Sequence, residues 1–273
     1  MHLGQLAQIT IYPVKSSAGL NLTQTQIEPR GLRFDRRWMI VAAATGHFLS
    51  ARETPQLLQL LVQPSEQGLH LQAPGLDLQV ATPAPDGQRQ VSVWDDELSA
   101  RLADSETNNR LSDWLGQAVQ LVYMAPENQR AIDPRYATAA AQSVSFADGY
   151  PILLLSAASL SELNRRLLEK GRGALSMARF RPNLVVDTAL AAHAEDAWKR
   201  IQIGAAEFAV VKPCVRCVLT TIDPDTLQRE PDNEPLKTLI EYRRSPKGVT
   251  FGMNLIPLNQ AELALGMSVV RLA

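Results

Sequence analysis

Short apolar segments interrupted by turn residues run through the first third of this chain and limit it to a β-rich fold. Aliphatic side chains dominate five such segments, and Pro, Gly, Asn or Asp lie between them: residues 6–14, 20–27, 38–43, 57–63 and 69–72. Residues 76–80 alternate apolar and polar side chains, which is typical of a strand with one face in water. The pattern predicts a first unit built mostly from short strands.

Helices are expected at three places in the rest of the chain, at residues 101–115, 156–169 and 235–243. These segments have apolar side chains at helical spacing or begin with a residue that favours a helix start, such as Ser156 or Pro235. Residues 126–146 are rich in Ala, Gln and Ser without a steady period, which indicates a loop-rich crossover. Strand-like segments return after it, at residues 184–186, 202–203, 207–211, 218–222, 251–258 and 268–272. We therefore predict a mainly β fold with helices (α+β), divided into residues 1–124 and 125–273, and not a doubly wound βαβ array.

Charge and composition disfavour several classes of partner. The chain of 273 residues carries 27 Lys and Arg against 28 Asp and Glu, and this balance disfavours non-specific binding to nucleic acid. Residues 1–14 lack the charge cluster and the apolar run of a signal peptide, and no apolar stretch is long enough to span a bilayer. Two cysteines do not make a disulfide scaffold. We expect a cytoplasmic protein that binds neither nucleic acid nor membrane.

The two cysteines, Cys214 and Cys217, form a C-x-x-C pair with cations beside them. A structural zinc site lacks further ligands, because the four histidines are scattered. A thioredoxin-type redox pair would open a helix, whereas this pair lies between strand-like segments. Two buried structural cysteines are the plain alternative. Against that alternative, Lys212 and Arg216 flank the thiols and would stabilise a thiolate, the form that binds a soft metal.

Strand alternation separates the two thiols. In a regular strand Val215 and Cys217 share one face, while Cys214 and Arg216 share the other. The thiols would then not both face one site. We therefore expect one cysteine to carry the chemistry and the other to be ancillary.

Positive charge is concentrated in a few turns, although the chain is close to neutral overall. Lys15 and Ser16 end one strand-like segment, and three arginines lie within residues 31–38. Arg179 and Arg181 form a similar cluster of positive charge in the second unit. Taken singly, each turn is typical of a solvated face or a surface ion pair. Together they suit a compact phosphorylated ligand, since guanidinium groups bind phosphate bidentately and a Lys-Ser turn adds a charge and further donors. Neither a G-x-G-x-x-G nor a G-x-x-x-x-G-K-[ST] loop is present, which disfavours dinucleotide and P-loop nucleotide sites.

Four motifs, taken in order, resemble the MOSC family. They are Tyr12-Pro13-Val14-Lys15-Ser16, Asp35-Arg36-Arg37-Trp38, Phe180-Arg181-Pro182-Asn183 and Arg216-Cys217-x-x-Thr220-Thr221-x-Asp223-Pro224-Asp225-Thr226. The chain is similar to the branch that contains the mitochondrial amidoxime-reducing components and the bacterial YcbX-type proteins. The resemblance covers essentially the whole chain, and its last motif is long and specific. It implies an N-terminal MOSC β-barrel domain in residues 1–124 and a MOSC β-barrel domain in residues 125–273.

The resemblance also implies a molybdenum cofactor, a pyranopterin, bound between the two units. Cys217 would be the thiolate ligand of molybdenum and a catalytic residue. Asp148 matches a family carboxylate near the metal and would deliver protons. The residues implied in holding the cofactor are Lys15, Ser16 and Arg36 from the first unit, and Arg181, Asn183 and Arg216 from the second. Pyridoxal phosphate binding is implied only at the level of the family.

The activity implied by the resemblance is reduction of N-hydroxylated compounds: hydroxylamines, amidoximes or N-hydroxylated base analogues. The sequence has neither the cysteine spacing of a [2Fe–2S] domain nor a flavin fingerprint. We therefore expect a separate electron-transfer protein, a ferredoxin or a flavoprotein reductase. Two alternatives stay open. In the first, Cys217 carries a persulfide and the protein is a sulfur carrier for metallocofactor sulfuration. In the second, the protein binds or stores the cofactor without turnover.

Overall fold

Strands dominate the computed structural model, which describes residues 1–138 and 142–273. The strands of this part of the chain are His2–Ile11 (β1), Leu20–Leu22 (β2), Gln24–Glu28 (β3), Gly31–Leu32 (β4), Trp38–Ala42 (β5), Leu61–Ser65 (β6), Gly68–Ala73 (β7), Leu76–Ala81 (β8), Gln88–Val93 (β9), Asp96–Leu102 (β10), Val119–Tyr123 (β11), Ile152–Ser156 (β12), Leu184–Asp187 (β13), Arg200–Ile203 (β14), Ala206–Val215 (β15), Arg244–Ser245 (β16), Gly248–Pro257 (β17), Glu262–Ala264 (β18) and Ser268–Arg271 (β19). The α-helices are Ser105–Leu115 (α1), Ala157–Glu169 (α2) and Leu236–Arg243 (α3), and the 3₁₀ helices are Pro55–Gln59 (η1), Met177–Phe180 (η2), Ala194–Ala197 (η3), Val218–Thr221 (η4) and Pro231–Asn233 (η5). The predicted mainly β fold with helices is confirmed.

Seven strands close into a β-barrel. Their order is β12-β13-β1-β19-β14-β15-β17, and β17 pairs with β12 to complete the ring. β12 and β13 run parallel, whereas the other neighbours in the ring are antiparallel. Closure satisfies the backbone groups of each strand on both sides, so the ring is a stable support for the loops at its rim.

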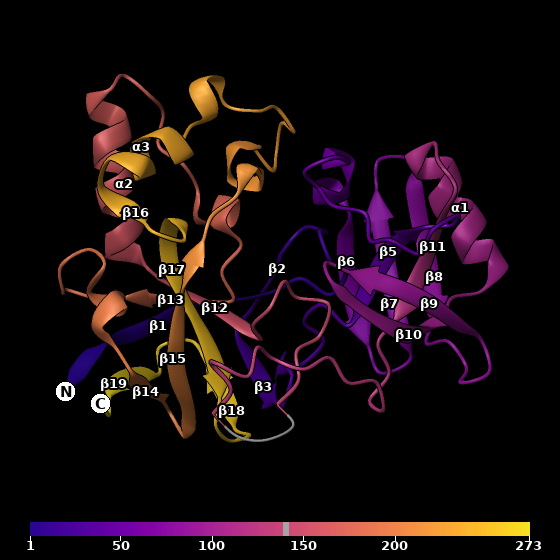
Figure 1. Ribbon diagram of the computed structural model, residues 1–273, viewed down its shortest axis with the longest axis horizontal. Coiled ribbons are helices and arrows are strands. Elements are labelled where there is room, and N and C mark those ends of the chain that lie inside the picture. Colours follow the sequence, from indigo (N-terminus) through magenta and orange to yellow (C-terminus); the bar gives the residue numbers. More distant parts are fainter. Residues whose placement is uncertain (139–141) are drawn as a thin grey trace.

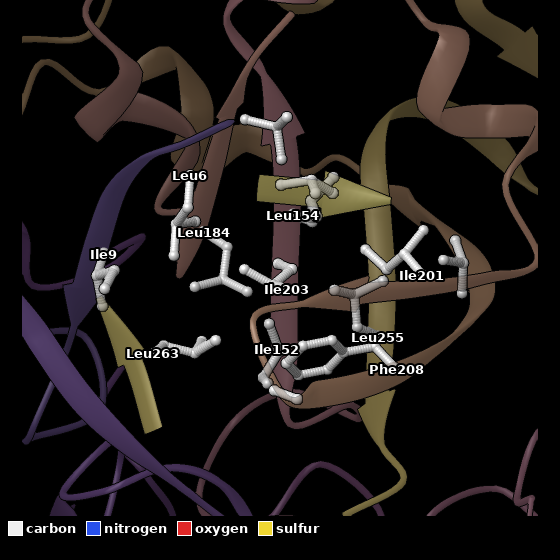
Figure 2. Packing of buried hydrophobic residues seen from close by; sticks show 14 of the residues in the cluster. Leu6, Ile9, Ile152, Leu154, Leu184, Ile201, Ile203, Phe208, Leu255 and Leu263 are labelled. Carbon is white, nitrogen blue, oxygen red and sulfur yellow. The ribbon is translucent and has the colours of Figure 1, made fainter. Parts of the chain in front are cut away.

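Aliphatic and aromatic side chains fill the barrel. Leu6, Leu154, Phe208 and Leu255 come from four different strands and pack in one buried cluster (Figure 2). Full burial of such a side chain contributes about 1.5–3 kcal/mol. The interior is therefore a packed core, and the space for a ligand lies outside it.

The first strand joins the start of the chain to its second half. β1 lies between β13 and β19 in the ring, with Ile9 opposite Leu184. In Figure 1 the indigo β1 lies among the orange and yellow strands, whereas the purple strands that follow it lie at the other end of the long axis. Directly after β1, Val14 bridges to Trp38 at the start of β5. The loop that carries Lys15 therefore runs from the barrel into the second region of the molecule.

Smaller sheets form that second region. One has the strand order β5-β11-β10-β9 and another the order β6-β7-β8. Leu111 of α1 packs against Leu71 and Leu121 in a core separate from that of the barrel. The two regions thus have their own hydrophobic cores, as independently packed units do.

Several predicted elements differ from the structure. Residues 218–222 were predicted as a strand, but η4 (Val218–Thr221) lies there instead. Helix α1 begins at Ser105 rather than at residue 101, because β10 continues to Leu102 and the Asp104 carboxylate then caps the helix by accepting a hydrogen bond from Thr107 N at 2.7 Å. The segment at residues 57–63, predicted as a strand, contains the end of η1 and the start of β6. Pro55 in the first turn of η1 favours this short helix.

Helices α2 and α3 cover the barrel at the end far from the smaller sheets (Figure 1). The Ser156 side chain caps α2 by accepting a hydrogen bond from Ser159 N, as the sequence predicted. Leu163 of α2 and Leu239 of α3 pack with Phe251 of β17. In the predicted crossover, the described residues 126–138 and 142–146 contain no helix or strand longer than an isolated bridge.

Candidate functional site

One cleft is lined by every side chain that the sequence singled out as a site residue. Its volume is about 310 Å³, and it also takes in residues of the smaller sheets. The site residues come from the loop after β1, the turn before β5, the crossover before β12, the turn after η2 and the segment after β15: Lys15, Ser16, Arg36, Asp148, Arg181, Asn183, Arg216 and Cys217. The tertiary structure thus brings these distant positions together at one place.

Lys15 and Asp148 form an ion pair in the cleft. The buried Lys15 Nζ donates to Asp148 Oδ1 at 2.6 Å and to the Phe146 carbonyl at 2.8 Å, and Trp94 Nε1 donates to the same Asp148 oxygen at 3.2 Å. Burial lowers the pKa of the Lys15 ammonium more than Asp148 raises it. Desolvation raises the pKa of the Asp148 carboxyl, but the charge and hydrogen bond of Lys15 outweigh it, and the pKa lies well below its ordinary value. Asp148 is therefore ionised at neutral pH.

Hydrogen bonds from Arg130 hold the segment that carries Asp148 in place at the cleft, although this segment has no regular secondary structure. Its buried guanidinium donates to the carbonyls of Ser145 at 3.0 Å and Asp148 at 2.8 Å, and also to that of Ala147. Its Nε donates to Asp96 Oδ2 at 2.6 Å. Arg130 thus ties the crossover to β10 and takes the place of the hydrogen bonds that a strand would have supplied.

The charge of Arg36 is compensated by the neighbouring Asp35. Its Nη1 donates to Asp35 Oδ2 at 2.6 Å and to Asn183 Oδ1 at 3.1 Å, and Asp35 is completely buried. Burial lowers the pKa of Arg36, but Asp35 raises it more, so the pKa lies above its ordinary value. The Asn183 amide also accepts from Leu153 N and donates to the Thr10 carbonyl. These contacts hold Arg36 in place, and contact of Asn183 with a ligand stays a prediction.

Arg181 lies in the same cleft without a counter-ion. Its Nη1 donates to the Ser17 carbonyl at 2.7 Å, and its guanidinium lies 4.0 Å from the centroid of the Tyr12 ring. Among the residues that the structure describes, no carboxylate lies within 4 Å of it. Burial lowers the pKa of Arg181 to about 10, so the side chain is still protonated at neutral pH. It is a desolvated cation that can attract an anion.

Arg216 is another cation of the cleft that has no carboxylate partner among the described residues. Its Nη2 donates to the Phe180 carbonyl at 2.7 Å, and its Nη1 lies 3.0 Å from Cys214 Sγ. Its Nε is buried and has no hydrogen-bonding partner in the described part of the chain. Buried N–H groups are normally satisfied, so this orphaned donor marks a place for an acceptor that the protein does not supply.

The expected separation of the two thiols is wrong, because both Cys214 and Cys217 line the cleft. The register of β15 against β17 shifts between Pro213 and Val215, and β15 ends at Val215. A bulge re-aims the side chains around it, so the alternation of a regular strand does not continue to Cys217. Arg216 Nη1 contacts Cys214 Sγ, so this cation lies against the cysteine that the sequence analysis considered ancillary.

The Cys217 thiol is exposed at the edge of the cleft. Its backbone carbonyl accepts from Thr220 N at 3.1 Å and from Thr220 Oγ1 at 2.9 Å, which fixes the turn into η4. Within residues 1–138 and 142–273, no group of three or more His, Cys, Asp or Glu side chains is arranged to hold a metal ion. A metal at Cys217 would therefore have fewer than three such protein ligands from these residues and would need other ligands from a cofactor.

Three of the predicted site residues have a left-handed backbone. The φ angles of Ser16, Arg36 and Arg181 are 71°, 50° and 54°. Such angles are uncommon in residues other than glycine and cluster where the surrounding structure holds a functional geometry. The three residues thus share a backbone feature that the sequence did not reveal.

The Asp-Pro-Asp-Thr motif links two parts of the site. Asp223 Oδ1 accepts two hydrogen bonds from backbone N–H groups of its own turn, each of 2.9 Å. Asp223 Oδ2 accepts from Arg179 Nη2 at 2.6 Å, and Arg179 lies two residues before Arg181. The ion pair therefore couples the segment that follows Cys217 to the segment that carries Arg181.

Sequence reasoning missed Arg52 and Trp94, which also line the cleft. The Arg52 guanidinium lies 4.5 Å from the centroid of the Trp94 ring. Arg52-Glu53 has the appearance of an ordinary surface pair in the sequence. An aromatic residue in a turn was the available signal, since Trp94-Asp95 separates two alternating segments.

The fold and the cleft together define a class of protein: a closed β-barrel beside smaller sheets, with uncompensated cations and an exposed thiol in one cleft. Comparison with known sequences agrees with this description. Residues 3–118 match the pattern described as "MOSC N-terminal beta barrel domain", and residues 141–270 match the "MOSC domain". The chain belongs to the MOSC family.

Several relatives have named activities. The chain is 33% identical over 253 residues to "Mitochondrial amidoxime-reducing component 1" of Mus musculus, covering 88% of this chain and 72% of the relative. It is 31% identical over 284 residues to the protein of the same name from Homo sapiens, covering 97% and 82%. It is also 29% identical over 267 residues to "Molybdenum cofactor sulfurase" of Oryza sativa subsp. japonica, covering 92% of this chain but 32% of the relative. No helix in the described ranges is both long and apolar enough to cross a bilayer.

Proposed function

We propose that this protein reduces N-hydroxylated compounds with a molybdenum cofactor held in the cleft. The observation that carries the proposal is the exposed Cys217 thiol in one cleft with Arg181 and Arg216, two cations without a carboxylate partner in the described residues. The names of the amidoxime-reducing relatives support the substrate class. The soft thiolate supports molybdenum as the metal.

The residues of the cleft fit a phosphorylated pterin. Guanidinium groups bind phosphate through two parallel hydrogen bonds, and Arg181 and Arg216 have no carboxylate that would compete. Arg216 Nε and the Tyr150 hydroxyl are both buried without a hydrogen-bonding partner among the described residues. The residues proposed to hold the cofactor are Lys15, Ser16, Arg36, Arg181, Asn183 and Arg216, with Cys217 as the metal ligand. When bound, the cofactor would supply a two-electron redox centre for cleavage of an N–O bond.

The net reaction shows that the enzyme needs a source of two electrons and a source of two protons. A hydroxylamine, R–NHOH, takes up two electrons and two protons and yields R–NH₂ and water. We propose that the electrons come from a separate protein, a ferredoxin or a flavoprotein reductase. The protons must reach the substrate oxygen from groups in the cleft or from water.

We assign proton delivery to the Lys15–Asp148 pair rather than to Asp148 alone. Asp148 is ionised at neutral pH and accepts hydrogen bonds, so it is a poor acid by itself. The Lys15 ammonium carries the proton of the pair, and burial makes that proton easier to release by lowering the pKa. Asp148 then acts as the acceptor that receives protons at the exposed side and holds Lys15 in position.

Metal analysis combined with turnover tests the proposal. Protein purified from a host that makes the cofactor should contain about one molybdenum atom per chain, because one thiolate holds one metal. It should reduce benzamidoxime when reduced methyl viologen supplies the electrons. Cys217→Ser should lose both metal and turnover, whereas Cys214→Ser should keep the metal. Loss of molybdenum from Cys214→Ser alone would show that the ligand assignment is wrong.

A sulfur carrier is the second candidate, because one relative is named molybdenum cofactor sulfurase. In this role Cys217 would carry a persulfide for metallocofactor sulfuration. Metal-free protein with a cyanide-labile sulfur that disappears in Cys217→Ser supports the carrier and contradicts the reductase. Molybdenum without turnover of any N-hydroxylated compound supports a storage protein instead. The cytoplasmic location stays a prediction.

A further inference from the structure

Arg52 is a cation of the cleft that the proposed cofactor set does not use. Lys15 has Asp148 as its counter-ion, and Arg36 has Asp35. Arg52 has no carboxylate within 4 Å in the described part of the chain, although it lines the same cleft as Cys217. It belongs to the loop between β5 and η1, so it enters the cleft from the smaller sheets rather than from the barrel.

The Arg52 side chain is held in place by contacts that leave its terminal Nη groups free to bind a ligand. Its Nε donates to Ser50 Oγ at 2.9 Å, and its backbone N–H donates to the same oxygen at 3.2 Å. Its guanidinium lies over the Trp94 ring at 4.5 Å, a cation–π contact. These contacts engage Nε and one face, and both terminal Nη groups are left without a hydrogen-bonding partner among the described residues. A guanidinium group held in this way, with both Nη groups free, is suited to bind an oxyanion through two hydrogen bonds.

Trp94 supports Arg52 from a strained position. It lies in the two-residue turn between β9 and β10 with φ at 58°, and the residue is 41% exposed. For a residue with a Cβ this backbone region is strained, and glycine or asparagine is the usual choice in such turns. The indole is further fixed by Phe48 at 5.0 Å and by the hydrogen bond from Nε1 to Asp148. Strain that is kept at an exposed aromatic residue in a cleft indicates a functional position.

We propose that Arg52, supported by Trp94, forms a recognition subsite for an anionic group of the substrate, a carboxylate or a phosphate. The favoured substrates are then N-hydroxylated compounds that carry such a group. The part of this inference that concerns N-hydroxylation rests on the proposed function, whereas the preference for an anion rests on Arg52. A charged hydrogen-bonding pair in the cleft should favour the anionic member of a matched pair about 10-fold to 100-fold.

Calorimetric titration of the molybdenum-loaded full-length protein tests the subsite with two matched pairs of compounds. One pair is benzamidoxime and 4-carboxybenzamidoxime, and the other is N4-hydroxycytidine and its 5′-monophosphate. In wild-type protein the anionic member of at least one pair should bind more tightly, and the pair with the larger ratio identifies carboxylate or phosphate as the preferred group. Loaded protein is essential, because a free cofactor site would itself attract anions through Arg181 and Arg216.

Matched variants separate the subsite from the cofactor site. Arg52→Ala should abolish the anion preference while keeping the molybdenum content. Arg52→Lys should keep part of the preference, because the positive charge remains but the two Nη donors of the guanidinium group are lost. Trp94→Ala should weaken the preference, whereas Trp94→Phe should retain most of it. Arg110→Ala, which removes an exposed arginine of α1 outside the cleft, should bind both pairs as wild type does.

The outcomes distinguish this subsite from the proposed function. Equal binding of neutral and anionic members by wild type, or an anion preference that survives in Arg52→Ala, overturns the subsite. Loss of molybdenum from Arg52→Ala also overturns it, since Arg52 would then belong to the cofactor site. If wild type binds the anionic compounds through Arg52 but reduces none of the four with reduced methyl viologen, the subsite stands and the proposed function fails.

Discussion

Arg36 and Arg181 occupy nearly equivalent positions in the cleft and differ mainly in their counter-ions. Both have a left-handed backbone, and their guanidinium groups lie 4.3 and 4.0 Å from the centroid of the same Tyr12 ring. Arg36 pairs with the buried Asp35, whereas Arg181 has a backbone carbonyl as its hydrogen-bonding partner. The pKa of Arg36 is accordingly raised, and that of Arg181 falls to about 10.

The cations of this cleft therefore have two different roles. The charge of a buried cation that has its own carboxylate is compensated within the protein. Removal of either partner leaves an uncompensated charge in the interior. A buried cation without one is costly for the fold and becomes satisfied when an anion binds. Lys15 belongs with Arg36 in the first group, and Arg216 belongs with Arg181 in the second. We therefore expect the Asp35–Arg36 pair to contribute most to folding, and Arg181 and Arg216 to contribute most to retention of the cofactor.

The largest expected effect is on stability, in Arg36→Ala. This change leaves Asp35, which is 0% exposed, without its counter-ion, and the free energy of unfolding should fall by about 3–5 kcal/mol. Denaturant unfolding measures it. The double variant Asp35→Asn, Arg36→Gln removes both charges and should recover a substantial part of the loss. A loss below about 1 kcal/mol in the single variant would mean that the pair is not a structural one.

The next effect concerns turnover, in Asp148→Asn. The substitution keeps a side chain of the same shape but removes the negative charge that pairs with the Lys15 ammonium and receives protons at the exposed side, so reduction of benzamidoxime should slow about 100-fold. Molybdenum content should stay close to that of wild type, because the proposed metal ligand, Cys217, is unchanged. Rates measured at fixed molybdenum content check this. An unchanged rate would remove the Lys15–Asp148 pair from the proposed proton path.

A smaller effect, on cofactor retention, is expected in Arg181→Ala. The molybdenum that remains after extensive dialysis should fall about 10-fold, since a supporting ligand contact is lost. The free energy of unfolding should change by less than about 1.5 kcal/mol, because no carboxylate is left unpaired. Arg181→Lys should retain an intermediate amount of metal. The comparison breaks down if Arg181→Ala unfolds as easily as Arg36→Ala.

The smallest effect is the pH dependence that Asp148 contributes to stability. Its pKa in the folded protein lies below its ordinary value of 3.8, so the contribution is present above about pH 4 and is lost as the pH falls further. The Asp148 side chain is 76% exposed, and solvent screening limits the contribution to about 1 kcal/mol or less. Unfolding of wild type and Asp148→Asn should therefore differ at pH 6 and converge towards pH 2. A difference that grows on acidification would contradict the assigned direction.

The parts of the site that could be predicted from the sequence are those carried by contiguous motifs. Lys15-Ser16 and Arg216-Cys217 are adjacent in the chain, so their chemistry is visible as a short pattern. Arg52 and Trp94 belong to no such motif and become part of the cleft when the smaller sheets pack beside the barrel. The separation of Cys214 and Cys217 was mispredicted because a bulge in β15 breaks the alternation on which the prediction depended.

By itself, the sequence determined the local elements: short strands, helix α2 with its Ser156 cap, and turns rich in Lys and Arg. Strand period, capping and turn preference act over a few residues, and for this reason they can be read along the chain. The tertiary structure decided that β1 completes a barrel formed by the second half of the chain, and that Asp35 neutralises Arg36 while Arg181 stays unpaired. Strand pairing and Coulomb interactions act between residues that are close in space, however far apart they lie in the chain, so only the folded arrangement could determine them.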